Sequence, residues 1–265
     1  IDLLHWCLKE AKKQGADEVS AILSKNRQSA FEIRNGDVDL LEGADQTSLS
    51  LALFIDERYS VNQTSILRKS SLSGFIRHAA ELTRQINRDP FRRLPDPKQY
   101  WQGPGRDLNI SDPAIHTLEP AQKREIPMQL ERMVRKKKRE VVSVTTSYSD
   151  SFSQMIRISS NGFEGEREGT SFSVGSEVVV RGKRDDLPSD WFYSYTRHFN
   201  DIPELDLIAE KSLNYALAKI GQKKIESGRY DMIVMNRSAS RLVGMILSAM
   251  TGSKLWNKST FLEGK

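Results

Sequence analysis

The stretch Gln28–Gly43, QSAFEIRNGDVDLLEG, decides how the first part of the chain folds. Gln28–Arg34 alternates apolar and polar residues well enough to predict a strand. Asn35-Gly36 follows it directly, and both residue types tolerate the positive φ angles of a tight hairpin turn. The sequence therefore predicts two antiparallel strands joined at Asn35-Gly36.

The residues around this hairpin extend it into an α+β unit. Ile1–Gln14 has the pattern of an amphipathic helix, and Gly15 suits its C-terminal cap. The remaining expected elements of residues 1–87 are strands at Glu18–Lys25, Ser48–Ile55 and Arg58–Ser65, and a helix at Ser71–Ile86. The predicted first domain is residues 1–87.

Residues 119–227 repeat this order of elements. A second hairpin turn is expected at Asn161-Gly162. The other expected elements are helices at Glu119–Lys138 and Leu205–Ile220, and strands at Val141–Tyr148, Gln154–Ser159, Thr170–Arg181 and Trp191–His198. We predict an internal duplication of a helix–hairpin–strands–helix unit, in which two units cover each other's apolar faces. The fold class is α+β, with antiparallel or mixed sheets and flanking helices, because hairpins imply antiparallel pairing.

Residues 88–118 form a proline-rich connection between the two units. Arg88–Ala114 contains five of the nine prolines of the chain. Its aromatic and basic residues could bind an extended peptide or nucleic acid. We favour the alternative, a loop that packs Tyr100 and Trp101 onto the domain.

The last predicted region, residues 228–265, is a strand, a buried helix and a loop. Tyr230–Met235 is a short apolar run bounded by Gly228, which predicts a strand. Ser238–Met250 is apolar almost all round, which predicts burial, and Ser238 or Ser240 can cap it. This helix has no His, Asp, Glu or Cys. It therefore offers neither a zinc ligand nor a general base.

Composition indicates a globular protein rather than a disordered one. The 265 residues carry a formal net charge of +5, and we interpret this as a mixed surface that leans basic rather than as a nucleic-acid interface. The basic run Arg135–Glu140, RKKKRE, suits a solvated helix end. The single cysteine, Cys7, lies on an apolar helix face and favours a reducing, cytoplasmic location.

Segments for export or membrane insertion are not visible in the sequence. The chain has no run of the roughly 20 apolar residues that a membrane-spanning helix needs. It begins at Ile1 rather than Met and stops at Lys265 inside a motif-like segment. We therefore expect a fragment whose missing part lies at the C-terminus.

Two stretches resemble one known family. GRYDMIVMNRSASRLVGMILSAMTGSKLWNKSTFLEGK is similar to the central region of the TldD/PmbA family, long labelled "modulator of DNA gyrase". GADEVSAILSKNRQSAFEIRNGDVDLLEGADQTSLSLALFIDERYS is similar to the opening domain of that family, so the resemblance spans essentially the whole chain. One subunit type of the family carries an HExxxH zinc motif on the helix that corresponds to Ser238–Met250. This chain resembles the other, metal-free PmbA (TldE) type.

The resemblance implies a function as the non-metal-binding subunit of a cytoplasmic TldD/TldE-type metalloprotease. No cofactor is expected in this chain, and zinc is expected only in a partner subunit. The expected partner is an HExxxH-bearing TldD-like subunit or, in a dimer, a second copy of this chain. The substrates would be unfolded or modified peptides, and this chain would contribute cavity wall and substrate binding. Two alternatives stay open: a regulatory protein that acts on DNA gyrase, and a homodimeric peptidase with ligands outside these residues.

No residue is assigned a catalytic role. The four histidines, His5, His78, His116 and His198, are scattered without metal-ligand spacing. The resemblance implies that Arg167 and Glu168, beside an acidic hairpin turn, line an inter-subunit cavity. Four residues that follow the predicted helix form either an exposed turn or a loop that positions a substrate or partner strand: Lys254, Lys258, Ser259 and Thr260.

Overall fold

The computed structural model describes residues 1–101, 103, 105–183 and 186–264. The chain separates into two compact units, Ile1–Gly221 and Gln222–Lys265. Each unit is described by itself. Among the described residues, no helix combines the length and apolar character that crossing a bilayer requires.

The first unit is built on one six-stranded antiparallel sheet with the order β3-β2-β1-β4-β5-β6. Its strands are β1 Glu18–Arg34, β2 Asp37–Ile55, β3 Arg58–Thr64, β4 Val141–Ser159, β5 Glu164–Val180 and β6 Ser189–Thr196. The predicted α+β class with antiparallel pairing is confirmed. The strands at Glu18–Lys25 and Gln28–Arg34 are one continuous 17-residue strand, and β4 likewise merges two predicted strands.

The two predicted units meet edge to edge. β1 pairs with β4 from Ser20 with Ser159 to Arg34 with Thr145, so residues 1–87 and 119–227 contribute three strands each to the same sheet. The expectation that two sheets cover each other face to face is wrong, because the edges of the two hairpins satisfy one another instead. Both halves have the same element order, while their origin by duplication stays a prediction.

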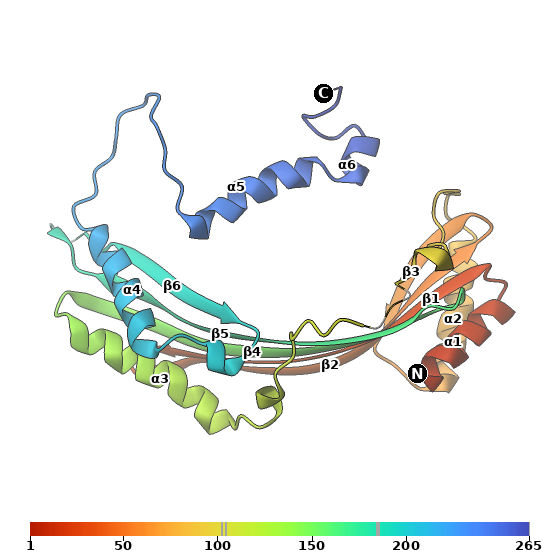
Figure 1. Cartoon of the computed structure of the whole chain (residues 1–265), viewed down its shortest axis with the longest axis horizontal. Helices are drawn as coiled ribbons and strands as arrows, with labels where there is room; N and C mark the ends of the chain where they lie inside the picture. The colour runs from red at the N-terminus through yellow and green to blue at the C-terminus, as the bar shows by residue number, and fades with distance from the viewer. Residues whose placement is uncertain (102, 104, 184–185, 265) are drawn as a thin grey trace. The chain divides into compact units, whose positions relative to one another are not determined.

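Four helices cover one face of this sheet: α1 Asp2–Lys13, α2 Lys69–Thr83, α3 Pro120–Lys137 and α4 Leu205–Ala218. Ile158 packs in the core under α1 and α2, whereas Tyr148 packs in the core under α3 and α4. Both residues have even numbers on β4, so they point to the same side of the strand. In Figure 1 the long strands curve, with α1, α2 and α3 on the outer side of the curve. The opposite face of the sheet carries none of these helices.

The hairpin turns are formed largely as predicted. Asn35 and Gly36 have φ angles of 53° and 92°, and the Gly36 N–H donates to buried Glu131 on α3 over 3.0 Å. The second hairpin is also confirmed, but only Gly162 in that turn has a positive φ, of 95°. The Ser159 N–H donates to the Phe163 carbonyl over 2.8 Å, so this loop is longer than the first.

The connection between the halves contains two short 3-10 helices, η1 Pro97–Gln99 and η2 Pro113–His116. The prediction that Tyr100 packs onto the domain is confirmed: its hydroxyl lies 3.0 Å from Asn161 Oδ1 and its ring lies 4.9 Å from the Phe163 ring. For Trp101 the same prediction is wrong, because its side chain is 79% exposed.

The second unit contains α5 Asn236–Ala249 and α6 Gly252–Trp256. The predicted strand at Tyr230–Met235 is absent, since no described residue there pairs in a sheet and Ile233 is 98% exposed. The predicted burial of the helix is also wrong, because only Ala249 of α5 is buried. The helix begins after Met235 without a side-chain cap. A segment this short has too little apolar surface of its own to bury such a helix.

Candidate functional site

The side of the sheet opposite α1–α4, which we call the open face, carries many polar side chains. The even-numbered residues of β1 share it with the odd-numbered residues of β4, β5 and β6, as the strand register shows. The central part of β4 places an unbroken row of four serines on it, at alternate positions: Ser147, Ser149, Ser151 and Ser153. The opposite side of the same strands carries most of their buried apolar residues, among them Tyr148, Phe172 and Val174, so the polar face follows from the sequence pattern.

Two adjoining hollows lie on the open face. The first has a volume of about 230 Å³ and is bordered by Ser149, Ser173 and Tyr195. The second has a volume of about 240 Å³. Both are also lined by Gln28 and Ser151, so they adjoin. Together they form a polar trough across β1, β4 and β5.

One end of the open face is acidic. One row of paired residues crosses the four strands β1, β4, β5 and β6 at this end. In that order its members are Glu32, Ser147, Gly175 and Tyr193. Burial, first, and then the negative charge of Asp39 and a hydrogen bond to it raise the pKa of Glu32, while Arg34 opposes the rise. A register shift next to Glu32 places Asp39 beside it, as bulges commonly re-aim a side chain.

Tyr193 lies against this acidic end. Burial raises the pKa of its phenol, and the charges of Glu177 and Glu32 add to the rise, which a hydrogen bond with Ser147 partly offsets. Its ring crosses directly over Gly175: a Cβ on that glycine would overlap Cγ and Cδ1 of Tyr193. Gly175 is therefore required for the ring to lie flat on the sheet.

A buried polar group lies on the helix-covered side of the same strands. The Lys123 Nζ atom lies 2.6 Å from Asp150 Oδ2 and donates to Ser29 Oγ over 3.2 Å. Ser29 donates to Asp150 Oδ1 over 2.7 Å, and Tyr148 donates to Oδ2 over 2.8 Å. A serine beside a lysine can act as a nucleophile pair. Here Ser29 and Lys123 both bind the Asp150 carboxylate, so these contacts hold α3 against β1 and β4.

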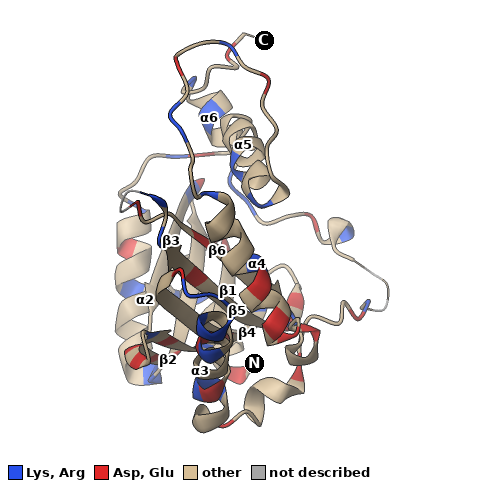
Figure 2. Ribbon diagram, turned by 90° about the vertical axis from the view of Figure 1, so that its left-hand side faces the viewer, with Lys and Arg blue, Asp and Glu red and all other residues tan. Residues whose placement is uncertain are grey.

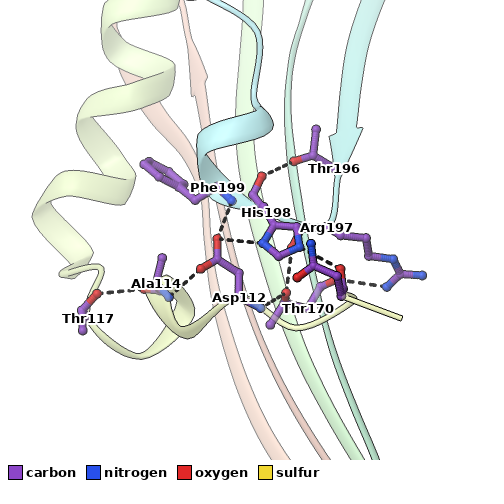
Figure 3. Close-up of polar contacts among 9 residues, drawn as sticks. Asp112, Ala114, Thr117, Thr170, Thr196, Arg197, His198 and Phe199 are labelled. Carbon is purple, nitrogen blue, oxygen red and sulfur yellow. Dashed lines mark hydrogen bonds and ion pairs between the residues drawn. The ribbon is translucent and has the colours of Figure 1, made fainter. Parts of the chain in front are cut away.

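A second polar group, drawn in Figure 3, fastens the proline-rich connection to β5. The Thr170 hydroxyl accepts from the Asp112 N–H over 2.9 Å and donates to the Arg197 carbonyl over 2.7 Å. Asp112 accepts the Phe199 N–H over 2.7 Å, and His198 Nε2 lies 2.8 Å from the Asn109 carbonyl. Aspartate, histidine and a hydroxyl are thus neighbours, but each is engaged by the backbone. We interpret the group as structural: it holds the proline-rich connection against β5 and the residues that follow β6.

Arg167 and Glu168 lie on β5, where neighbouring residues point to opposite faces. Arg167 pairs in register with Met155 and lies on the open face. Glu168 lies on the helix-covered side and accepts from Gln154 Nε2 over 2.8 Å. Of the two, only Arg167 shares a surface with the polar trough.

The other four predicted site residues belong to the second unit. Lys254 is in α6, and its carbonyl accepts the N–H of Ser259 over 2.9 Å. Lys258 has a φ of 52° and lies 3.8 Å from a carboxylate oxygen of Glu263. The Thr260 hydroxyl accepts from the Leu262 N–H over 3.3 Å. These contacts hold the loop after α5 together, and its role in binding stays a prediction.

The four histidines contact different partners, and none of the contacts found among the described residues joins one histidine to another. His5 is 3.1 Å from Glu164, and His78 is 3.8 Å from Glu81 and exposed on α2. Within the described ranges, no three or more His, Cys, Asp or Glu side chains gather in a way that could hold a metal ion. The ribbon colours of Figure 2 show basic and acidic residues on both α2 and α3.

Sequence reasoning missed the acidic end of the open face. Its signals were present. Tyr193 and Tyr195 alternate with Ser194 and Thr196, and Gly175 interrupts a strand pattern, which often marks a close approach of another group. What the sequence did not show is that β1 becomes a neighbour of β4. Only that pairing brings Glu32 into the row with Tyr193.

Comparison with known proteins agrees with this architecture. The profile of the PmbA/TldA metallopeptidase central domain matches residues 113–220. Metalloprotease PmbA of Escherichia coli O157:H7 is 20% identical over 256 residues, which is 96% of this chain and 55% of that protein. A PmbA homologue of Buchnera aphidicola is 22% identical over 99% of this chain and 58% of its own length. The chain thus spans a little more than half the length of these relatives.

Solved structures give the same result. A protein of Bacteroides thetaiotaomicron described as a modulator of DNA gyrase superposes with a TM-score of 0.91 at 34% identity, covering all of this chain and 60% of that protein. TldE from Thermococcus kodakarensis has the same fold, with a TM-score of 0.74 at 16% identity over 99% of this chain and 58% of that one. The protein is thus of the metallopeptidase-like class that these relatives represent. The predicted resemblance to the PmbA/TldD family is confirmed, because a family domain profile, curated PmbA relatives and solved structures all match this chain.

Proposed function

We propose that this chain is the non-metal-binding subunit of a cytoplasmic TldD/TldE-type metallopeptidase that takes unfolded or modified peptides. It would contribute a wall of the substrate cavity and hold the peptide, and a partner subunit would supply zinc. The observation that carries this proposal is the composition of α5, which corresponds by resemblance to the zinc-binding helix of the partner type.

The side chains of α5 do not suit zinc. Asn236–Ala249 contains no His, Cys, Asp or Glu, which are the residues that bind Zn²⁺ in proteins. Its polar positions are amide, guanidinium and hydroxyl groups, and the rest are aliphatic or thioether side chains. A helix of this composition also offers no carboxylate to act as general base toward a water molecule.

The division of labour follows from this chemistry. A zinc ion in the partner would activate water and polarise the scissile carbonyl. This chain would position the peptide. The open face of the first unit, which lies opposite α1–α4 and carries a row of hydroxyl groups, is suited to that role.

Regulation of DNA gyrase, named in the description of the Bacteroides relative, has less support from the residues of this chain. Its basic run is partly neutralised within the fold: Arg135 donates to Glu131 over 2.8 Å, and Lys137 lies 2.8 Å from Asp206. Two of the five cations of this run are therefore already paired with carboxylates and are less available to bind phosphate groups.

Co-expression of the full-length protein with an HExxxH-bearing subunit tests the proposal. We expect a stable complex by size-exclusion chromatography, zinc bound by the partner, and hydrolysis of an unstructured peptide by the mixture alone. A partner whose HExxxH glutamate is replaced by glutamine should assemble without hydrolysis. Stoichiometric zinc and peptide hydrolysis by the full-length protein alone would instead identify a homodimeric peptidase and overturn the proposal.

A further inference from the structure

We infer that the open face binds an extended basic peptide segment, with an arginine or lysine side chain seated at the acidic end formed by Glu32, Glu177 and Tyr193. This inference deepens the proposed function, on which it rests, by naming the chemical class of the peptide. It is carried by the charge, the aromatic lining and the spacing of polar groups on one sheet face.

The charges at this end are unbalanced. Arg34 lies 3.8 Å from Asp39 and offsets one carboxylate. Within the described part of the chain, neither Glu32 nor Glu177 has a cation within ion-pair distance. The Glu177 side chain is exposed, whereas Glu32 is half-buried beside Asp39. A ligand cation placed between them would relieve this repulsion, which a neutral or acidic ligand would not do.

The aromatic residues beside these carboxylates suit a cation. The Tyr193 ring lies flat over Gly175 and is 5.6 Å from the Trp191 ring, so an aromatic surface borders the carboxylates. The faces of such rings attract guanidinium and ammonium groups. The same strand already provides one example, because the Arg197 guanidinium lies 5.9 Å from the centre of the Tyr195 ring.

The floor of the trough matches an extended chain rather than a compact ligand. Ser149, Ser151 and Ser153 line the trough at alternate positions of β4, roughly 6.8 Å apart, and Ser147 continues this row toward the acidic end. An extended peptide presents its own alternate groups at the same interval, so successive hydroxyls can meet successive peptide groups. The acidic end then receives one side chain of that peptide.

Binding of short labelled peptides to the purified full-length protein, without any partner, tests the inference. The probes are an unstructured peptide with three arginines, the same peptide with three citrullines, and the same peptide with three glutamates. Citrulline keeps the shape and removes the charge. Fluorescence anisotropy at low and physiological salt should show binding of the arginine peptide only, weakening as salt rises.

Two substitutions locate the binding site. Glu32→Gln combined with Glu177→Gln should weaken arginine-peptide binding roughly three- to tenfold, the range that two partly exposed charges produce. Glu81→Gln combined with Glu210→Gln, an equal change of two charges at exposed positions of α2 and α4, should leave binding unchanged. Gly175→Ala should also weaken binding by displacing Tyr193, and circular dichroism and thermal unfolding would verify that this variant is folded. If it is not, Tyr193→Leu replaces it.

Equal binding of the arginine and citrulline peptides, or unchanged binding by the double variant, would overturn the inference. So would the absence of any peptide binding. These results are independent of assembly with a zinc-bearing subunit. Assembly and hydrolysis without arginine preference would contradict this inference alone, whereas arginine-peptide binding without assembly would contradict only the proposed function.

Discussion

The Lys123–Asp150 pair shows how single residues stabilise the first unit. The two side chains are 12% and 4% exposed, and Ser29 and Tyr148 complete the hydrogen bonds of the carboxylate. Burial raises the pKa of the Tyr148 phenol, and the charge of Asp150 raises it further. The tyrosine therefore stays protonated and donates to Asp150 across the physiological pH range.

Removing one partner of the Lys123–Asp150 pair should lower the stability of the folded protein. Lys123→Met leaves Asp150 buried without its cation, which we expect to lower the free energy of unfolding by about 3 kcal/mol. Lys13→Met, which removes a lysine that is 71% exposed and paired with Glu10, should cost less than about 1 kcal/mol. Urea denaturation measures both. Equal effects would show that the buried pair is not held as described.

Cys7 should be chemically inert in the folded protein. It is fully buried in the core under α1 and α2, and burial raises the pKa of its thiol to about 11. Because the thiolate is the reactive form, Ellman's reagent at pH 8 should label the native protein only very slowly, and one thiol per chain in denaturant. Stoichiometric labelling of native protein within minutes would contradict the packing of α1.

Glu32 should make stability depend on pH. Its pKa is raised in the fold, so the folded state binds the proton more tightly than the unfolded chain. This contribution is fully present below the pKa of the unfolded chain and is lost as pH rises through the folded pKa. Glu32→Gln should therefore raise the melting temperature at pH 7 and change it little at pH 4. A lower melting temperature at pH 7 would contradict the cause given.

At the scale of elements, the tight turn between β1 and β2 depends on the conformation of one glycine. Gly36 has a φ of 92°, with open space where a Cβ would lie, so backbone strain alone opposes substitution. Gly36→Ala should cost roughly 1–2 kcal/mol. Gly43→Ala, within β2 and equally uncrowded but without positive φ, is the matched control and should be close to neutral. Thermal unfolding compares them, and a neutral Gly36→Ala would contradict the turn type.

At the scale of the whole molecule, the two units should differ in resistance to proteolysis. Residues 222–235 lie outside helices and strands, and Lys223 and Lys224 are exposed. Limited trypsin digestion should cut there first, because unpaired exposed backbone fits a protease. Mass spectrometry should then show a persistent fragment of the first unit. Early cleavage at Lys25 or Arg34 within β1 would contradict a stable sheet.

The parts of the fold that depend on local patterns were predictable. Asn35-Gly36 specifies its turn through the φ angles that its residues tolerate, and α1 through α4 follow helical periodicity. Strand lengths were underestimated. Lys25 and Asn26 interrupt the alternation of β1, yet the strand continues because its backbone pairs with β2 on one side and β4 on the other. The backbone hydrogen bonds of a central strand form whether or not apolar and polar side chains alternate along it.

The candidate site was less predictable than the fold. The burial of α5 was inferred from its apolar composition, but composition reports what a helix can bury and not what is present to cover it. Likewise, Glu32 and Tyr193 are 161 positions apart in sequence and meet through three successive strand pairings. No local pattern links them.

The sequence by itself determined the α+β class, both hairpins and a helix α5 without metal-ligating residues, since each of these depends on residue type and short-range spacing, and it carried the resemblance to the PmbA/TldD family. Only the tertiary structure decided that the two halves join through β1 and β4, that α1–α4 lie on one face of the sheet, and that polar residues of the two halves share the other face. The physical reason is that pairing between distant strands is made by backbone groups, which every residue except proline provides, so side-chain patterns do not specify which strands will be neighbours.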